Sequence, residues 1–253
     1  MEKSEPTFTD LLLETHIGLE RQGPGSPETV MKALGFLGSL DRFEQVADLG
    51  CGTGGQTMLL AEYLPGHIAA LDMFPAFIDE LKKKAKNKNL ENKVEGVLGN
   101  MGKLPFQENS FDLIWSEGAI DNIGFRKGLV HWRRFLKNGG YIAVTSPTWL
   151  TGEHLEIVDK FWRDAGSRLD TAQHNIKIMQ DSGYTFVAAF ALTENCWTEN
   201  YFTPREAAIR RLLEKYGKSE TMQKYAELNR HEVELYLKYK QHYGYVFYIG
   251  KAV

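Results

Sequence analysis

Short apolar runs alternate with amphipathic segments between residues 45 and 147. The runs are unbroken, as in strands buried on both faces, and the segments between them carry apolar residues at helical spacing. Such alternation predicts a parallel sheet with helices on both faces. The predicted strands are QVADLG from residue 45, HIAALDM from 67, KVEGVLGN from 93, FDLIWSEG from 111 and YIAVTSP from 141.

Single residues mark the ends of two predicted helices. Ser26 before Pro27 is typical of a helix start, because a serine hydroxyl caps the first amides and proline suits the first helical position. Further along, apolar residues recur at helical spacing from Phe125 to Leu136. This pattern predicts a helix that ends at Gly139.

The two ends of the chain depart from the alternation, and we expect four parts. Residues 1–44 indicate an N-terminal helical cap with a loop rich in glycine and proline. Residues 45–192 are expected to form the core, and the mostly helical residues 193–241 an insertion that acts as a lid. Residues 242–253, rich in aromatic and β-branched side chains, predict the last strand of the core sheet.

Composition narrows the function classes. The 253 residues carry a net charge of −3, which argues against a nucleic-acid-binding surface. No apolar run approaches the roughly 20 residues of a membrane span, and the N-terminus lacks the apolar segment of a secretion signal. The only cysteines, Cys51 and Cys196, predict neither a disulfide framework nor a metal site, and the histidines lack metal-ligand spacing. We therefore expect a cytoplasmic protein without metal; its oligomeric state is open.

A glycine-rich loop follows the first predicted strand. Gly50, Gly52 and Gly55 match G-x-G-x-x-G between a strand and a helix, and Asp72 lies 22 residues after Gly50. This arrangement is typical of a dinucleotide site. Asp48, however, would face a pyrophosphate unfavourably. S-adenosylmethionine has no phosphate, and its ammonium group would be attracted to Asp48; capping of the loop's own amides is the alternative role for this carboxylate.

Four sequence blocks resemble one known family. VADLGCGTGGQT resembles the first motif of the class I (Rossmann-like) S-adenosylmethionine-dependent methyltransferases. The later blocks ALDM, GNMGKLPFQENSFDLIWSEGAI and LKNGGYIAVTSP resemble that family's next motifs in order and spacing. The resemblance spans roughly residues 45 to 147 and is strongest to the small-molecule branch that includes quinone-biosynthesis methyltransferases. It implies a doubly wound, mostly parallel seven-stranded α/β sheet in the order 3-2-1-4-5-7-6, with the last strand antiparallel.

The resemblance also implies a cofactor, S-adenosyl-L-methionine, and residues that bind it. The loop glycines would line its methionine part, Asp72 would bind the ribose, and Ser116 and Glu117 would lie beside the sulfonium. Arg21 would pair with the carboxylate, with a solvated arginine as the alternative. The expected cofactor-binding residues are Arg21, Asp48, Gly50, Cys51, Gly52, Gly54, Gln56, Asp72, Met73, Asn100, Met101, Ser116 and Glu117.

No catalytic residue is assigned, because in-line attack on the sulfonium methyl needs positioning more than it needs an acid. Glu117 is the best candidate for a general base, and a purely geometric role is the alternative. His16 in the cap is another candidate, with a surface histidine as its alternative. Trp149, Trp197 and Tyr201 are expected to roof a pocket for a small-molecule acceptor; simple packing onto the sheet is their alternative.

Two other functions remain open. A nicotinamide-dependent oxidoreductase uses the same glycine pattern, but it should have a second substrate domain with proton-transfer residues. A non-catalytic S-adenosylmethionine-binding module is the other alternative. Ser116-Glu117-Gly118-Ala119 stands where nucleobase methyltransferases carry Asn/Asp-Pro-Pro-Tyr, which lowers the expectation of DNA methylation. The acceptor and the atom that is methylated are not predicted.

Overall fold

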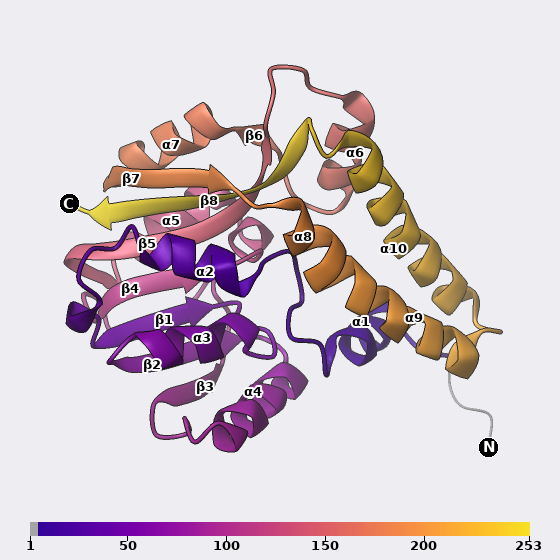
Figure 1. Ribbon diagram of the computed structural model, residues 1–253, viewed down its shortest axis with the longest axis horizontal. Helices are drawn as coiled ribbons and strands as arrows, with labels where there is room; N and C mark the ends of the chain where they lie inside the picture. The colour runs from indigo at the N-terminus through magenta and orange to yellow at the C-terminus, as the bar shows by residue number, and fades with distance from the viewer. Residues whose placement is uncertain (1–4) are drawn as a thin grey trace.

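One mixed sheet runs through the protein in the order β3-β2-β1-β4-β5-β8-β7 (Figure 1). The structure, a computed structural model, describes residues 5–253, so the first four residues of the expected cap lie outside it. The strands are β1 (Gln45–Leu49), β2 (His67–Asp72), β3 (Val94–Leu98), β4 (Phe111–Ser116), β5 (Leu136–Trp149), β6 (Asp170–Thr171), β7 (Tyr184–Ala191) and β8 (Tyr243–Ala252). The two-residue β6 pairs with β5 off the main path and was not expected.

Strand directions confirm the predicted topology. Strands β1 to β5 pair in parallel with one another. The final strand β8 lies between β5 and β7 and is antiparallel to both. Without β6, the observed order is the predicted 3-2-1-4-5-7-6.

Helices cover both faces of the sheet (Figure 1). Alternate strand residues point to opposite faces, so Val46 and Trp115 join one apolar cluster while Leu49 and Ile114 join the other. The first cluster includes residues of α2, α3, α4 and α6, and the second includes residues of α5 and α7. Their bounds are α2 (Pro27–Leu34), α3 (Gly55–Tyr63), α4 (Pro75–Asn87), α5 (Phe125–Arg133), α6 (Glu156–Asp164) and α7 (Ala172–Asp181).

The predicted start of α2 is confirmed, and the predicted end of α5 is wrong. Ser26 accepts a hydrogen bond from the backbone N–H of Thr29 at 3.2 Å, and Pro27 opens the helix. In contrast, α5 ends at Arg133, and Leu136 already belongs to β5, where it pairs with Phe111. Sheet pairing therefore overrides the helical spacing, and Gly139 lies within the strand.

The remaining helices form a separate group beside the sheet. Between β7 and β8 the chain forms α8 (Glu194–Trp197), a π-helical turn (Thr198–Phe202), α9 (Thr203–Tyr216) and α10 (Glu220–Tyr239). The N-terminal α1 (Phe8–His16) packs against α9 and α10, and a small apolar cluster joins them (Figure 1). Leu11 of α1 is fully buried in this cluster against Leu212 and Met222. The cap helix and the insertion thus support each other, although about 180 residues separate His16, the end of α1, from Glu194, the start of α8.

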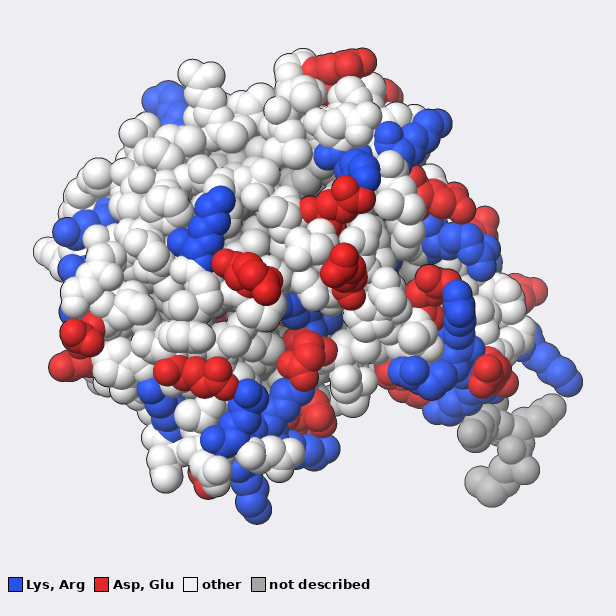
Figure 2. All heavy atoms as spheres, in the orientation of Figure 1, with Lys and Arg blue, Asp and Glu red and all other residues white. Residues whose placement is uncertain are grey.

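Three further features concern surface charge, membrane-spanning helices and metal sites. Lysine and arginine are interspersed with aspartate and glutamate over the face in Figure 2. Among the helices of residues 5–253, none combines the length and the apolar character that a membrane crossing requires. Over the same residues, no group of three or more histidine, cysteine or acidic side chains is arranged to hold a metal ion.

Candidate active site

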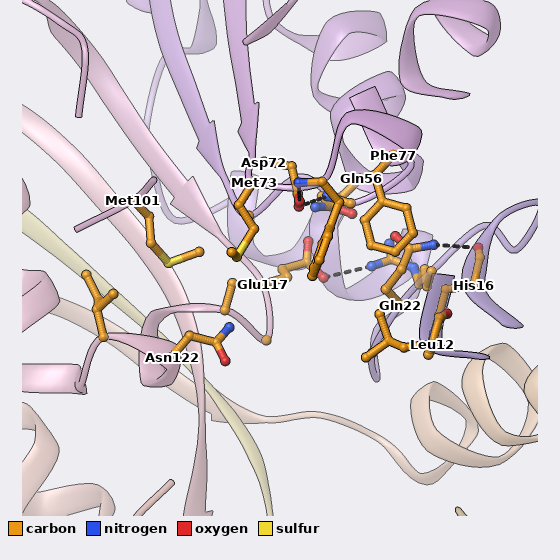
Figure 3. A pocket seen from close by; sticks show the side chains of 18 of the residues that line it. Leu12, His16, Gln22, Gln56, Asp72, Met73, Phe77, Met101, Glu117 and Asn122 are labelled. Carbon is orange, nitrogen blue, oxygen red and sulfur yellow. Dashed lines mark hydrogen bonds and ion pairs between the residues drawn. The ribbon is translucent and has the colours of Figure 1, made fainter. Parts of the chain in front are cut away.

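A cavity of about 530 Å³ opens at the carboxyl ends of β1, β2 and β4 (Figure 3). In open α/β sheets this edge is where ligands bind, and the volume lies within the range of small-molecule sites. Ten of the predicted site residues line its wall: His16, Arg21, Gly50, Gly52, Gln56, Asp72, Met73, Asn100, Met101 and Glu117.

The glycine loop forms the floor of the cavity. Gly50, Gly52 and Gly54 have positive φ angles of 77°, 54° and 87°, which favour glycine. The backbone N–H of Gly50 donates to the carbonyl of Leu71 at 2.8 Å, which ties the loop to β2. A Cβ atom on Gly50 would lie 2.4 Å from the Cβ of Ala119. The loop therefore needs glycine for its backbone turn and for its packing.

Asp72 lies on the cavity wall at the end of β2. Its carboxylate accepts hydrogen bonds from the backbone N–H groups of Gly52 and Phe74, each at 3.0 Å. Burial raises the pKa of this carboxyl, and the two backbone donors oppose that rise. Each carboxylate oxygen accepts several hydrogen bonds, so capacity remains for a ligand hydroxyl.

Asp48 does not lie on the cavity wall. Its side chain is fully buried and accepts a hydrogen bond from the hydroxyl of Thr57 at 2.6 Å. Burial raises its pKa to about 7, opposed by the Thr57 hydrogen bond. Asp48 therefore has no direct contact with the cavity in which the cofactor ammonium was expected, because β1 turns this side chain toward α3.

Three other predicted residues lie behind the wall. Cys51 is fully buried in the core, Gly54 packs near Leu81, and the hydroxyl of Ser116 donates to the carbonyl of Leu49 at 2.7 Å. They shape the cavity without lining it.

Arg21 and Glu117 form a buried ion pair across the cavity. Arg21 Nη1 donates to Glu117 Oε2 at 2.8 Å, and the side chains are only 7% and 4% exposed. The indole N–H of Trp115 donates to the other oxygen of Glu117, also at 2.8 Å. The second terminal nitrogen of Arg21, Nη2, is buried without a hydrogen-bond partner among residues 5–253.

The cap loop is fastened to the glycine loop. The side chain of Gln22 accepts from the backbone N–H of Thr53 and donates to its hydroxyl, both at 2.9 Å. The Thr53 hydroxyl donates to the carbonyl of Leu19 at 2.8 Å, and Lys84 donates to the same carbonyl at 3.2 Å. These bonds hold residues 19–22 over the floor of the cavity.

Comparison with known proteins assigns this architecture. Residues 47–144 match the family described as a methyltransferase domain. This stretch, from β1 to the middle of β5, is thus similar to a methyltransferase domain.

Curated relatives align with parts of the chain. Dimethylglycine N-methyltransferase of Parasynechococcus marenigrum is 28% identical over 151 residues, which cover 57% of this chain and 54% of that protein. Demethylmenaquinone methyltransferase of Listeria welshimeri is 34% identical over 101 residues, which cover 39% of this chain and 42% of that protein. The aligned part thus spans about half or less of the length of these relatives.

The fold is similar to that of solved methyltransferase structures over nearly its full length. An S-adenosylmethionine-dependent methyltransferase from Geobacter sulfurreducens, solved with S-adenosyl-L-homocysteine, superposes with a TM-score of 0.81 at 19% identity. The superposition covers 96% of this chain and 98% of that one. At this level of identity the likeness establishes the fold.

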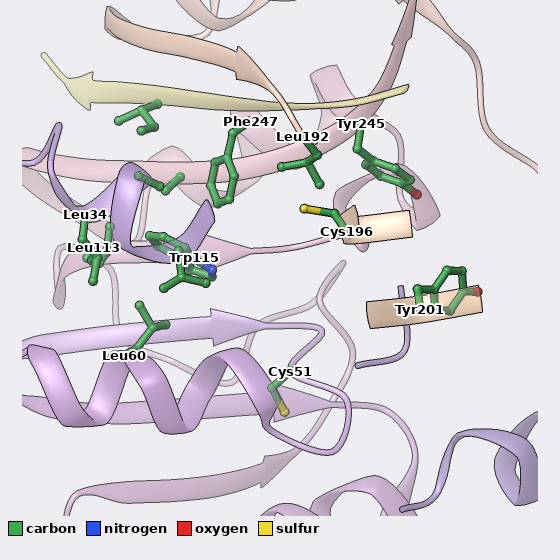
Figure 4. Close-up of a cluster of buried hydrophobic side chains, with 14 of the residues drawn as sticks. Leu34, Cys51, Leu60, Leu113, Trp115, Leu192, Cys196, Tyr201, Tyr245 and Phe247 are labelled. Carbon is green, nitrogen blue, oxygen red and sulfur yellow. The ribbon is translucent and has the colours of Figure 1, made fainter. Parts of the chain in front are cut away.

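Of the predicted acceptor-pocket residues, only His16 lines the cavity of the methyltransferase domain. Trp149 stacks on His154 with ring centroids 4.8 Å apart, away from the wall. Trp197 stacks on Tyr236 at 4.3 Å inside the core. Tyr201 belongs to the same buried cluster (Figure 4). Its ring also stacks on the ring of His16, with ring centroids 6.4 Å apart.

The expected aromatic roof is therefore replaced by other side chains. The insertion contributes no residue to the cavity wall; α1, which the insertion supports, contributes Leu12 and His16 instead. Sequence reasoning missed several lining residues, namely Leu12, Gln22, Phe74, Phe77, Asn122 and Ile123. A signal was present for two of them, since Phe74 and Phe77 start the helix that follows Asp72.

Proposed function

We propose that the protein binds S-adenosylmethionine in this cavity and transfers the methyl group to a small-molecule acceptor by in-line displacement at the sulfonium. One observation carries the proposal: the glycine loop, Asp72 and Glu117 line one cavity, and all of them lie within the residues that match a methyltransferase domain. The named activities of the relatives, which methylate dimethylglycine or demethylmenaquinone, support a small acceptor.

The residues on the wall fit the parts of this cofactor. Asp72 would bind the ribose hydroxyls with its remaining acceptor capacity. Met73, Asn100 and Met101 would contact the adenine. The unpartnered Nη2 of Arg21 fits the carboxylate of the methionine part, because a guanidinium donates to two acceptors at once.

Glu117 is better suited to positioning than to proton transfer. Both of its oxygens already accept hydrogen bonds, one from Arg21 and one from Trp115. A carboxylate held in this way would place negative charge next to a sulfonium. We therefore assign Glu117 a geometric and electrostatic role.

The chain's contribution to the reaction is alignment and closure. The cofactor supplies an activated methyl group, and the chain fixes its ends through Asp72 and Arg21. Such alignment lowers the barrier by roughly 7–11 kcal/mol in favourable cases. The cap loop, fastened through Gln22 and Thr53, excludes water from the floor of the site.

A pyrophosphate cofactor fits this wall less well. Asp72 and Glu117 line the cavity and would face the phosphates unfavourably, whereas Asp48 does not line it.

We propose that residues 1–44 and 193–241 act together as a lid over residues 45–192 and 242–253. We also propose that the protein works in the cytoplasm, without nucleic acid.

A methyl-transfer assay tests this proposal. Protein is incubated with S-adenosylmethionine labelled in the methyl group and with separate acceptors, including glycine, dimethylglycine, phenols and a naphthohydroquinone. Label that moves into one acceptor, with stoichiometric S-adenosylhomocysteine, supports the proposal. Binding of S-adenosylhomocysteine without transfer to any acceptor would favour a non-catalytic module instead.

A further inference from the structure

His16 lines the cavity and has one ring nitrogen without a hydrogen-bond partner among residues 5–253. The residue is only 7% exposed and lies on the cavity wall (Figure 3). Nδ1 lies 2.9 Å from the backbone carbonyl oxygen of Leu12, one helical turn earlier. A carbonyl only accepts, so Nδ1 carries the hydrogen and Nε2 is left as the acceptor. Nε2 is buried without a partner among residues 5–253.

The ring is held in place from behind. Tyr201 stacks against it with ring centroids 6.4 Å apart and planes at 21°. Arg205 in turn donates to the Tyr201 hydroxyl at 2.7 Å, and it also pairs with Glu232. The insertion therefore holds the imidazole through this stacked contact.

Charge and burial keep this imidazole neutral. Burial and the positive charge of Arg205 lower the pKa of His16 to about 4, while the hydrogen bond to Leu12 opposes that shift. A neutral acceptor that stays buried and unpaired is unfavourable, so such a group in a cavity indicates a donor that arrives with a ligand.

Apolar side chains and one closed ion pair make up part of the remaining wall. Leu12, Phe74 and Phe77 line the same cavity, and the charges of Arg21 and Glu117 compensate each other. A zwitterionic amino acid would need a free cation and a free anion, and the cofactor carboxylate would compete for Arg21. A neutral molecule with one donor group meets no such cost.

We propose that Nε2 of His16 accepts a hydrogen bond from the nucleophilic O–H or N–H of the methyl acceptor, and that the acceptor is a neutral, largely apolar molecule such as a phenol or an aromatic amine. This inference rests on the proposed function and narrows its substrate class. It excludes dimethylglycine, whose nucleophilic nitrogen in the neutral amine form carries no hydrogen.

Bonds, electrons and charge balance when the methyl group is transferred to an acceptor bound at His16. An electron pair of the acceptor oxygen or nitrogen forms the new bond to the methyl carbon, and the electron pair of the breaking C–S bond goes to sulfur. The proton of the acceptor passes along the hydrogen bond to His16 and then to water. One positive charge, that of the sulfonium, disappears as one appears on the imidazole, so the net charge of the closed site is unchanged.

Nitrogen NMR of the histidine rings tests the hydrogen bond without turnover. Protein labelled with ¹⁵N in histidine is saturated with S-adenosylhomocysteine and titrated with phenol, and in parallel with anisole, which lacks the O–H. The His16 signals are assigned by comparison with His16→Gln. Phenol should move the Nε2 resonance upfield, toward a hydrogen-bonded position, while anisole should not. Equal shifts, or no shift up to the solubility of phenol, would overturn the proposal.

Kinetics then tests the substrate class. With a phenol or aromatic amine that is methylated, His16→Gln should lower kcat/KM at least tenfold while the KM for S-adenosylmethionine stays within twofold. His154→Gln, at the exposed ring that stacks on Trp149, is the matched control and should change neither. Turnover of dimethylglycine at equal rates in wild type and His16→Gln would contradict the proposal. If the protein does not bind S-adenosylhomocysteine but phenol still shifts the Nε2 resonance, the result contradicts the proposed cofactor and not the role of His16.

Discussion

A Cβ atom on Gly55 would lie 2.0 Å from the backbone carbonyl oxygen of Glu20. Likewise, a Cβ atom on Gly52 would lie 2.0 Å from the side-chain oxygen of Gln22. These two positions of the loop therefore have no room for a side chain, because the cap segment lies directly on them. The glycine pattern serves the closure of the cap as well as the approach of a ligand.

Gly55→Ala should loosen the cap and weaken cofactor binding. The new methyl group meets backbone, which cannot rotate away, so residues 19–22 must shift and strain their bonds to Thr53. We expect the dissociation constant of S-adenosylhomocysteine to rise at least tenfold, measured by calorimetry. Gly152→Ala is the matched control, because nothing lies within 4 Å of its Cβ position. Equal affinities in the two variants would contradict this role of the cap.

Local patterns in the sequence predicted most of the fold. The strand that ends at Leu49, the glycine turn and the acid at position 72 were predictable because each depends on a short window of residues. The end of α5 was not, because the pairing of Leu136 with Phe111 depends on a strand far along the chain. Long-range sheet pairing determines that boundary.

The direction of side chains limited the prediction of the site. Asp48 and Trp197 have the expected types of side chain, a carboxylate and an aromatic ring, but these side chains point into the core. The spacing of residues does not say which side of a turn or helix will face a cavity that several segments build together. His16 reaches the wall because α9 and α10 hold α1 there, and no short window contains that information.

Arg21→Met should destabilise the fold strongly. The change leaves Glu117 buried without its cation, and loss of one partner of a buried pair costs about 3–5 kcal/mol. Urea denaturation measures the free energy of unfolding. Arg210→Met removes an exposed ion pair with Glu206 and should cost no more than about 1 kcal/mol. Similar losses of unfolding free energy in both variants would show that the Arg21–Glu117 pair stabilises the fold no more than an exposed ion pair does.

Asp48→Asn should change how stability depends on pH. The pKa of Asp48 is raised from 3.8 to about 7, so the folded protein binds more protons than the unfolded chain between these values. The free energy of unfolding therefore falls as pH rises through this window, by up to about 1.4 kcal/mol per unit. Asparagine keeps the Thr57 hydrogen bond and removes the titration.

The comparison of the two proteins isolates this effect. Asp121, also buried, has its pKa raised to about 7 and adds a slope of the same sign, whereas His16 adds one of the opposite sign. Both groups are present in wild type and variant. The difference in unfolding free energy should thus grow in favour of Asp48→Asn from about pH 4 to about pH 7. Parallel curves would contradict the burial-raised pKa.

Trp197→Ala should lower the stability of the fold without changing the affinity for the cofactor. The side chain is 1% exposed and stacks on Tyr236, so its removal leaves a core cavity that costs about 3–5 kcal/mol. Because Trp197 is absent from the cavity wall, the affinity for S-adenosylhomocysteine should stay within twofold at temperatures where the variant is folded. Tyr63→Ala, at a side chain that is 48% exposed, is the stability control. A large loss of affinity in Trp197→Ala alone would place this residue in the binding site after all.

Calorimetric titration with S-adenosylhomocysteine tests the central claim most directly. Wild type, Asp72→Ala and the surface control Asp79→Ala are titrated in parallel, with NAD as the competing ligand class. We predict micromolar binding of S-adenosylhomocysteine to wild type and Asp79→Ala, at least tenfold weaker binding to Asp72→Ala, and no heat with NAD. Binding of NAD without binding of S-adenosylhomocysteine would contradict the assignment of this cavity.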